Sequence, residues 1–312
     1  MFYILFSSLF FLPGCDEDKI IYNSGHSPEE EIEQQDSTHK RRINFSAQLL
    51  TYTTKNTSSP LLAERYATVY AFDNSTLSAQ VKYYTKEAGT LTPVNSAMYL
   101  PTGEYDLYAV GVNRPNVVLP SFSDGICNML ANNTDYIWWG TEDVAPLYPV
   151  SNYEIDFQHC CTQVVMQIDV ESGIEVNDFG YITLTPSDIS NVSWNLFYGT
   201  IGPSATISLI PDSAAYVKVN DSTFLAQMIM APIRVQNKIS MTVSFALRIN
   251  NEEVTRIYDA NLPVYDMNMK PGHSYYYDLL VRTDTVVINE INIVNWVNVD
   301  VNNKPIIPTE SD

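Results

Sequence analysis

The sequence is poor in positive charge: it has 17 Lys and Arg against 36 Asp and Glu, which gives 312 residues a net charge of −19. A protein that binds nucleic acid neutralises phosphates with clustered Lys and Arg, so we expect no nucleic-acid partner. Helix-forming runs are scarce too, because long amphipathic stretches of Ala, Leu, Glu and Lys are absent. The 21 Tyr residues and the abundant Thr, Val, Ile and Asn favour strands and turns.

Residues that carry out catalysis are few. Of four histidines, His26 and His39 lie in a polar N-terminal stretch, and His159 lies in a strand-like run, where we expect a hydrogen-bonded structural role. The sequence contains no HExxH, nucleophile elbow, CxxC, phosphate loop or dinucleotide fingerprint. We therefore expect no enzyme activity, no cofactor and no bound metal.

Cysteine is also scarce, with Cys15, Cys127, Cys160 and Cys161 the four present. The adjacent Cys160 and Cys161 would point to opposite faces of a strand, so at most one of them could pair with Cys127. Buried free thiols, which behave as small apolar residues, are the favoured interpretation, and a disulfide stays an alternative.

Strand-like runs separated by Pro, Gly, Asn and Ser clusters continue from Ile43 to near the C-terminus, and their spacing predicts an all-β protein built from β-sandwiches. We expect two such domains, residues 43–172 and 173–312, with the boundary near Gly173. The expected strands are 43–52, 66–72, 80–84, 105–112, 153–157, 163–170, 181–185, 205–210, 216–219, 223–230, 238–249, 254–258, 274–282 and 286–301.

The N-terminus has the pattern of an export signal. Residues 2–12 are apolar but too few to span a bilayer, which takes about 20 residues, so residues 1–14 are expected to be a signal peptide. Leu12-Pro13-Gly14-Cys15 resembles a bacterial lipobox, which implies lipidation of Cys15 and attachment to the outer membrane. The acidic residues that follow, Asp16, Glu17 and Asp18, resemble the surface-export signal of Bacteroidetes lipoproteins; a solvated tether is the alternative.

Residues 15–42, which begin with this Cys, are expected to form a flexible acidic linker, because they contain too little apolar surface to fold. The linker ends in a basic cluster directly before the first expected strand. Arg41 and Arg42 are candidate cleavage sites for a trypsin-like protease, with a simple charged face as the alternative.

Three landmarks give a family resemblance. They are the run from Leu100 to Val110 (LPTGEYDLYAV), the run from Asp156 to Val164 (DFQHCCTQV), and Met269–Tyr275 (MKPGHSY) followed by Ile291–Trp296 (INIVNW). Together they resemble the fimbrillin-like proteins of Bacteroidetes, subunits of type V pili. The resemblance implies transthyretin-like, Greek-key β-sandwiches and a structural or adhesive role in a fimbria, as stalk, anchor or tip. It also implies other fimbrial subunits as partners, assembly by proteolysis and strand exchange, and a host protein or glycan as an adhesion target.

The C-terminal run supplies a candidate donor strand, because Ile291, Ile293, Val297 and Val299 alternate with polar residues such as Asn292. A second interpretation is a surface glycan-binding lipoprotein of a polysaccharide-uptake system. Its stacking candidates are Trp138-Trp139 and the run 275–277, although adjacent aromatic residues in strands usually point half into the core.

Overall fold

The structure is a computed structural model that describes residues 40–51, 57–117, 119, 121–131, 133–186, 191–204, 212–213, 215–232, 238–264, 269–294 and 296. The described residues form strands, turns and loops without a helix, so none of them forms a helix that could cross a membrane. The all-β prediction is confirmed.

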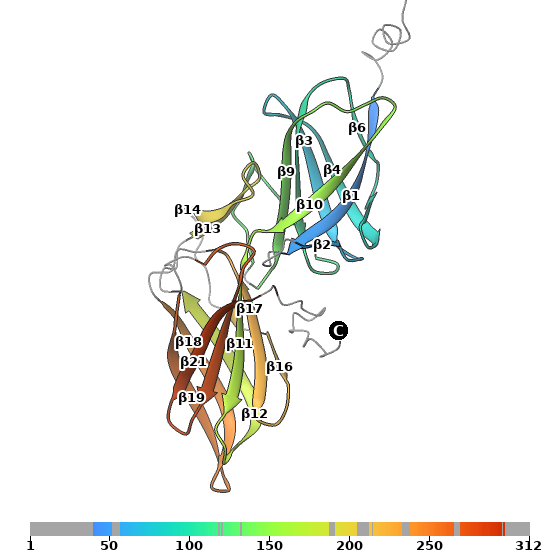
Figure 1. The fold of residues 1–312 in the computed structure, drawn as a ribbon. Helices are drawn as coiled ribbons and strands as arrows, with labels where there is room; N and C mark the ends of the chain where they lie inside the picture. The colour runs from blue at the N-terminus through green and yellow to red at the C-terminus, as the bar shows by residue number, and fades with distance from the viewer. Residues whose placement is uncertain are drawn as a thin grey trace, which may run out of the picture.

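Nine strands between residues 41 and 159 form one sheet that closes on itself (Figure 1). Its order is β10-β9-β7-β3-β4-β5-β1-β2, with β6 beside β1, and β1 also pairs with β10 in parallel. Alternate residues of β1 (Ile43, Phe45, Ala47 and Leu49) point into the core inside this sheet. The strands are β1 (Arg41–Thr51), β2 (Thr57–Pro60), β3 (Tyr66–Asp73), β4 (Thr76–Glu87), β5 (Thr90–Pro93), β6 (Met98–Leu100), β7 (Tyr105–Val112), β9 (Tyr136–Val144) and β10 (Val150–His159).

Two further sheets face each other across a second core, to which both contribute buried side chains such as Met166 and Phe245. This is the arrangement of a β-sandwich. The first sheet has the order β16-β17-β11-β20-β21, and the second has the order β15-β12-β18-β19. The strands are β11 (Thr162–Val170), β12 (Ile174–Pro186), β15 (Asp212–Ser213), β16 (Ala215–Lys218), β17 (Thr223–Met230), β18 (Lys238–Ile249), β19 (Glu252–Pro263), β20 (Ser274–Val281) and β21 (Val286–Val294).

A small fourth sheet joins distant parts of the sequence. The hairpin of β13 (Asn191–Asn195) and β14 (Ile201–Ser204) pairs with β8 (Ile126–Cys127), which lies between β7 and β9 in sequence. Figure 1 shows this hairpin beside the meeting point of the N-terminal sheet and the C-terminal sandwich. We call residues 191–204 the arm.

The predicted strands that fall within the described residues coincide with observed strands, and run 205–210 lies outside them. The predicted linker end at residue 42 is wrong by two residues, because β1 begins at Arg41. The pairing of β11 with β17 and β20 places it with the C-terminal strands, which favours a division at Cys160-Cys161 over the expected one near Gly173. The number and limits of the domains stay a prediction.

Candidate functional site

The candidate cleavage residues lie inside a paired strand. The Arg41 side chain is 5% exposed, and its Nη1 donates to Thr102 Oγ1 at 2.7 Å. The Arg42 side chain is exposed, but its backbone N–H donates to the carbonyl of Pro149 at 3.1 Å. The expectation of a flexible linker end at these two residues is therefore wrong, because both lie in β1, and cleavage at them stays a prediction. Cys15, Asp16, Glu17 and Asp18 lie outside the described residues.

β1 occupies a central position in the N-terminal sheet. Its residues 42–49 pair with β10 on one side, and β6, β5 and β2 pair with successive parts of its other side. Its four inward side chains contact a core that includes Ile155 and Phe157 of β10. Removal of β1 would leave an apolar groove bordered by the unpaired backbone of its neighbours.

The predicted donor run is partly described. β21 forms the edge of its sheet and pairs with β20, where Ile291 lies opposite Tyr277 and Ile293 opposite Tyr275. Ile291 packs against the C-terminal core, whereas Ile293 is 56% exposed. Val297 and Val299 lie outside the described residues. In the described part of the chain, no strand pairs with the other edge of β21.

A third hydrophobic cluster is built from both parts of the molecule, and we call it the junction cluster. The N-terminal sheet and its loops supply Tyr70, Phe72, Tyr108, Val110, Val112, Cys127 and Tyr136. The rest of the chain supplies Cys160, Cys161, Val192, Trp194, Leu196, Ile201, Ile229 and Trp296. Its cohesion is aromatic, since Trp194 packs at 5.2 Å between ring centroids against both Phe122 and Tyr136.

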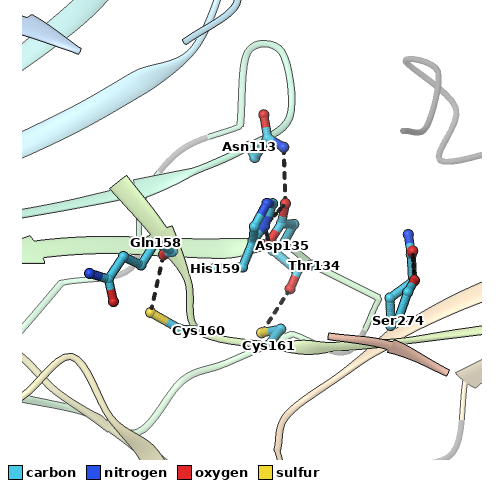
Figure 2. A network of polar contacts seen from close by, with 9 residues as sticks. Asn113, Thr134, Asp135, Gln158, His159, Cys160, Cys161 and Ser274 are labelled. Carbon is cyan, nitrogen blue, oxygen red and sulfur yellow. Dashed lines mark hydrogen bonds and ion pairs between the residues drawn. The ribbon is translucent and has the colours of Figure 1, made fainter. Parts of the chain in front are cut away.

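A buried polar network lies at the same junction. Both carboxylate oxygens of Asp135 are within 2.8–2.9 Å of His159 Nδ1, and Asn113 Nδ2 donates to Asp135 Oδ2 at 3.0 Å (Figure 2). The Trp296 ring stacks on the His159 imidazole with centroids 4.1 Å apart. Asp135 and His159 are both buried, so the carboxylate is held by partners in place of water. The predicted structural role of His159 agrees with these contacts.

Cys160 and Cys161 link β10 to β11, and their backbone is hydrogen-bonded to both the N-terminal and the C-terminal part of the molecule. The N–H of Cys160 donates to Tyr136 O, and the N–H of Gly272 donates to Cys161 O, both at 2.8 Å. The three described cysteines, Cys127, Cys160 and Cys161, are free and buried, which agrees with the favoured interpretation. Burial raises the pKa of the Cys160 and Cys161 thiols well above the usual range, and so keeps them protonated and unreactive.

The proposed sugar-stacking residues are largely used in packing. Trp138 Nε1 donates to Leu196 O at 2.7 Å, and Trp139 packs against the N-terminal core. Tyr275 and Tyr277 are buried, and Tyr276 donates its hydroxyl to Gln167 Oε1 at 2.9 Å. These rings therefore form no open stacking platform. Among the described residues, no group of three or more His, Cys, Asp or Glu side chains is placed to hold a metal ion.

Residues 50–296 match the fimbrillin-like protein family, and this span takes in the closed sheet apart from residues 41–49 of β1, the junction and the C-terminal sandwich. The chain belongs to the fimbrillin-like family. The family resemblance drawn from the three landmarks is thus confirmed, and membership in this family supports a role as a fimbrial or adhesin-type structural protein of the cell surface.

Solved structures share this fimbrillin-like fold at low sequence identity. A candidate cell adhesion protein from Bacteroides ovatus superposes with a TM-score of 0.58 at 14% identity, over 84% of this chain and 99% of that one. Candidate cell adhesion proteins from Bacteroides fragilis and Bacteroides uniformis give TM-scores of 0.56 and 0.55, each at 13% identity, over 83% and 82% of this chain and 99% of each of those chains. No curated protein matches the sequence.

Sequence reasoning missed three features of this fimbrillin-like junction: Asp135, the contact of Trp296 with His159, and the arm. Asp135 follows a run of polar loop residues, so nothing in its local pattern distinguishes it from a solvated turn residue. Trp296 belongs to one of the three landmarks, but its contact with His159 joins residues 137 positions apart. The signal that could have found the arm is the pair Val192 and Trp194, which alternate with polar residues as a strand does.

Proposed function

We propose that this fimbrillin-like protein is a non-catalytic, lipid-anchored surface subunit of a fimbria that joins neighbouring subunits by strand exchange. The observation that carries the proposal is the position of β1. It directly follows the N-terminal segment, it fills a central place in a closed sheet, and it supplies four apolar side chains to the core. A similar strand from another subunit could make the same contacts by strand addition.

The energetics favour a durable joint. Each fully buried apolar side chain contributes roughly 1.5–3 kcal/mol, and each ladder hydrogen bond contributes about 1 kcal/mol net. Three large side chains (Ile43, Phe45 and Leu49), with the smaller Ala47 and the ladder, therefore give on the order of 10 kcal/mol, which is enough to hold two subunits together. β21 supports the second half of the exchange, because it is an edge strand that continues into the alternating residues 297–301.

Two different cleavages would have different results. A cut after Arg41 or Arg42 leaves Ile43 to Leu49 in the core, so it would only release the folded part from its lipid anchor. A cut that frees β1 must fall between Thr51 and Tyr66, and Arg65 is the described basic residue there. Arg65 is half-buried, with Nη1 donating to Ala63 O at 2.7 Å. Its backbone N–H donates to Thr85 Oγ1 at 2.7 Å and its carbonyl accepts from Thr85 N–H at 2.9 Å, so this loop must open locally before a protease can cut it. We therefore propose Arg65 as the cut that opens the groove.

Fibre assembly in cells tests the different roles proposed for cleavage at Arg65 and at Arg41 or Arg42. Arg65→Ala should abolish incorporation into surface fibres and leave membrane attachment intact, whereas Arg41→Ala with Arg42→Ala should leave incorporation intact. Arg248→Ala is the matched control, because Arg248 is an exposed arginine far from β1 in the C-terminal sandwich. Normal fibres from the Arg65 variant would contradict groove opening by cleavage at this residue.

The anchor has its own test. Because Cys15 is the proposed acyl acceptor, Cys15→Ala should release the protein from the membrane fraction or block processing of the signal peptide. Cys127→Ala is the control, since this thiol is buried within the fold. An unchanged fractionation together with an unchanged N-terminal mass would reject the lipoprotein assignment.

A further inference from the structure

An apolar groove of about 420 Å³ opens beside the junction cluster. It lies between the end of β7, the start of β9 and the loop that connects them. Its apolar lining is Val112, Val117, Leu119, Met129, Ala131 and Tyr136, and its other lining residues are uncharged. We call it the junction groove.

The composition of the groove is typical of a surface that binds another polypeptide segment. Met129 at its rim is 82% exposed, which is unusual for so large an apolar side chain. Methionine adapts its shape to a bound chain better than branched residues do, because it is unbranched and has three rotatable bonds. An uncharged, apolar groove fits an apolar peptide segment rather than a charged ligand.

The C-terminal segment starts next to this groove. Trp296 belongs to the same cluster as Val112 and Tyr136, and Val117 and Leu119 pack against that cluster. The stack of Trp296 on His159 fixes its position, and His159 is itself held by Asp135. Trp296 is thus a buried, stacked residue from which the last 16 residues of the chain, 297–312, continue.

The first of these residues match the groove in chemistry and reach. In an extended conformation Val297, Val299 and Val301 lie on one face, and Asn298 and Asp300 on the other. Five extended residues span roughly 17 Å at about 3.3 Å each. Attachment at a fixed end gives the segment an effective concentration on the order of 1 mM, which favours it over a segment of another molecule at ordinary concentrations.

We propose that the junction groove binds residues 297–301 of its own chain, with Trp296 as the fixed end of the bound segment. In this state Val297 and Val299 are bound to their own chain and not to a neighbouring subunit. Here the inference rests on the proposed function: a subunit whose C-terminal run is bound in this way does not donate it, so release from the groove would precede donation to a neighbour.

A disulfide trap tests the inference on the purified full chain with Cys15→Ser, in which the remaining cysteines are buried. Met129→Cys combined with Val299→Cys should form an intramolecular disulfide under mild oxidation. It should form at least tenfold faster than Val219→Cys with Val299→Cys, whose first position is an exposed valine next to β16 of the C-terminal sandwich. Adding Trp296→Ala to the first pair should slow its disulfide at least tenfold.

Three outcomes would overturn the inference: a rate no higher than the control pair, disulfide-linked dimers without the intramolecular product, or no effect of Trp296→Ala. Equal circular dichroism spectra and Tm values for the Met129 and Val219 variants establish that both fold, and both positions are exposed. The measurement needs no fibre, so its failure leaves the fimbrial proposal standing. A loss of fibre assembly in the Arg65 experiment, in turn, says nothing against the groove.

Discussion

Asp135 and His159 illustrate what a buried polar pair does at a junction of apolar residues. A carboxylate removed from water is costly unless hydrogen bonds and opposite charge replace its hydration. Here His159 and Asn113 occupy the carboxylate oxygens, and Trp296 closes over the imidazole. Apolar contacts have no preferred direction, whereas hydrogen bonds do. The bond to Asp135 therefore sets the orientation of the His159 ring, and with it the orientation of the stacked Trp296 ring.

The first prediction concerns this pair. Asp135→Ala should lower the free energy of unfolding by about 3 kcal/mol, because it leaves His159 and Asn113 buried without their acceptor. Asp135→Asn should cost less, since an amide oxygen can still accept a hydrogen bond. Urea denaturation measures both, with exposed Asp156→Ala as the control. A loss below about 0.5 kcal/mol for Asp135→Ala, the range of ordinary surface substitutions, would contradict the network's role.

The second prediction concerns alkaline pH. Burial raises the pKa of Tyr83 and Tyr136 to about 12, and it also raises the pKa of Cys160 and Cys161. Unfolding restores ordinary values, near 10 for Tyr and near 8.5 for Cys, so above about pH 9 the unfolded chain binds fewer protons than the native one. Stability should therefore be constant at neutral pH and fall from pH 9 to 12, by up to about 1.4 kcal/mol per unit for each group.

Urea midpoints measured at successive pH values from 7 to 11 check this sign. Replacing Cys160 and Cys161 by Ala should shift the onset of the decline to higher pH, because the tyrosines ionise later than the thiols. A stability that rises between pH 9 and 11 would contradict the burial of these groups.

At the scale of elements, the sequence predicts strands whose apolar residues alternate and misses those whose surroundings break the pattern. β1 was predicted because Ile43, Phe45, Ala47 and Leu49 face one core. β9 was missed because its Trp138 contacts the arm on one face while Trp139 meets the core on the other, so its sequence shows no alternation. The alternation of Val192 and Trp194 indicates a strand in the arm, but the pairing of the arm with β8 could not be predicted, since β8 precedes it by more than 60 residues.

The same reason separates the predicted part of the candidate site from the missed part. The start of the first strand was predicted to within two residues, because basic and apolar runs are local signals, although Arg41 and Arg42 lie inside that strand. The burial of Arg41 depends on Thr102, and the setting of Trp296 depends on His159, and neither contact leaves a trace in neighbouring residues. The local sequence pattern therefore predicts the strands. Contacts between residues that are distant in sequence determine which side chains are exposed.

The third prediction concerns the arm. Gly199 has a φ of +63°, and a Cβ at this position would lie 2.2 Å from the Trp138 ring. Gly199→Ala should cost about 2–4 kcal/mol through backbone strain and overpacking. Gly202→Ala in the same hairpin is the matched control, because nothing lies within 4 Å of its Cβ position. Chemical denaturation that gives equal losses for the two variants would show that the arm does not pack against Trp138.

At the scale of the whole molecule, the junction cluster decides whether the chain behaves as one unit. The N-terminal core and the C-terminal core draw their residues from separate sheets, whereas the junction cluster uses residues from both parts. The arm adds a ladder to β8, and Leu196 N–H donates to Gly125 O at 2.8 Å. A pulling force along a fimbria would pass through these contacts as well as through the single link at Cys160-Cys161.

The last prediction follows from this shared cluster. The native protein should unfold in one calorimetric transition, with equal van't Hoff and calorimetric enthalpies, because neither part keeps its junction surface buried when the other unfolds. Trp194→Ala removes the largest fully buried side chain of the cluster and should cost about 3–5 kcal/mol. It should also separate the transition into two, since the remaining contacts no longer couple the parts. Phe245→Ala is the matched control, because it should cost a similar amount within the C-terminal core and leave the junction intact. Two transitions in the unmodified protein, or a single transition in the Trp194 variant, would show that the junction does not couple the two parts.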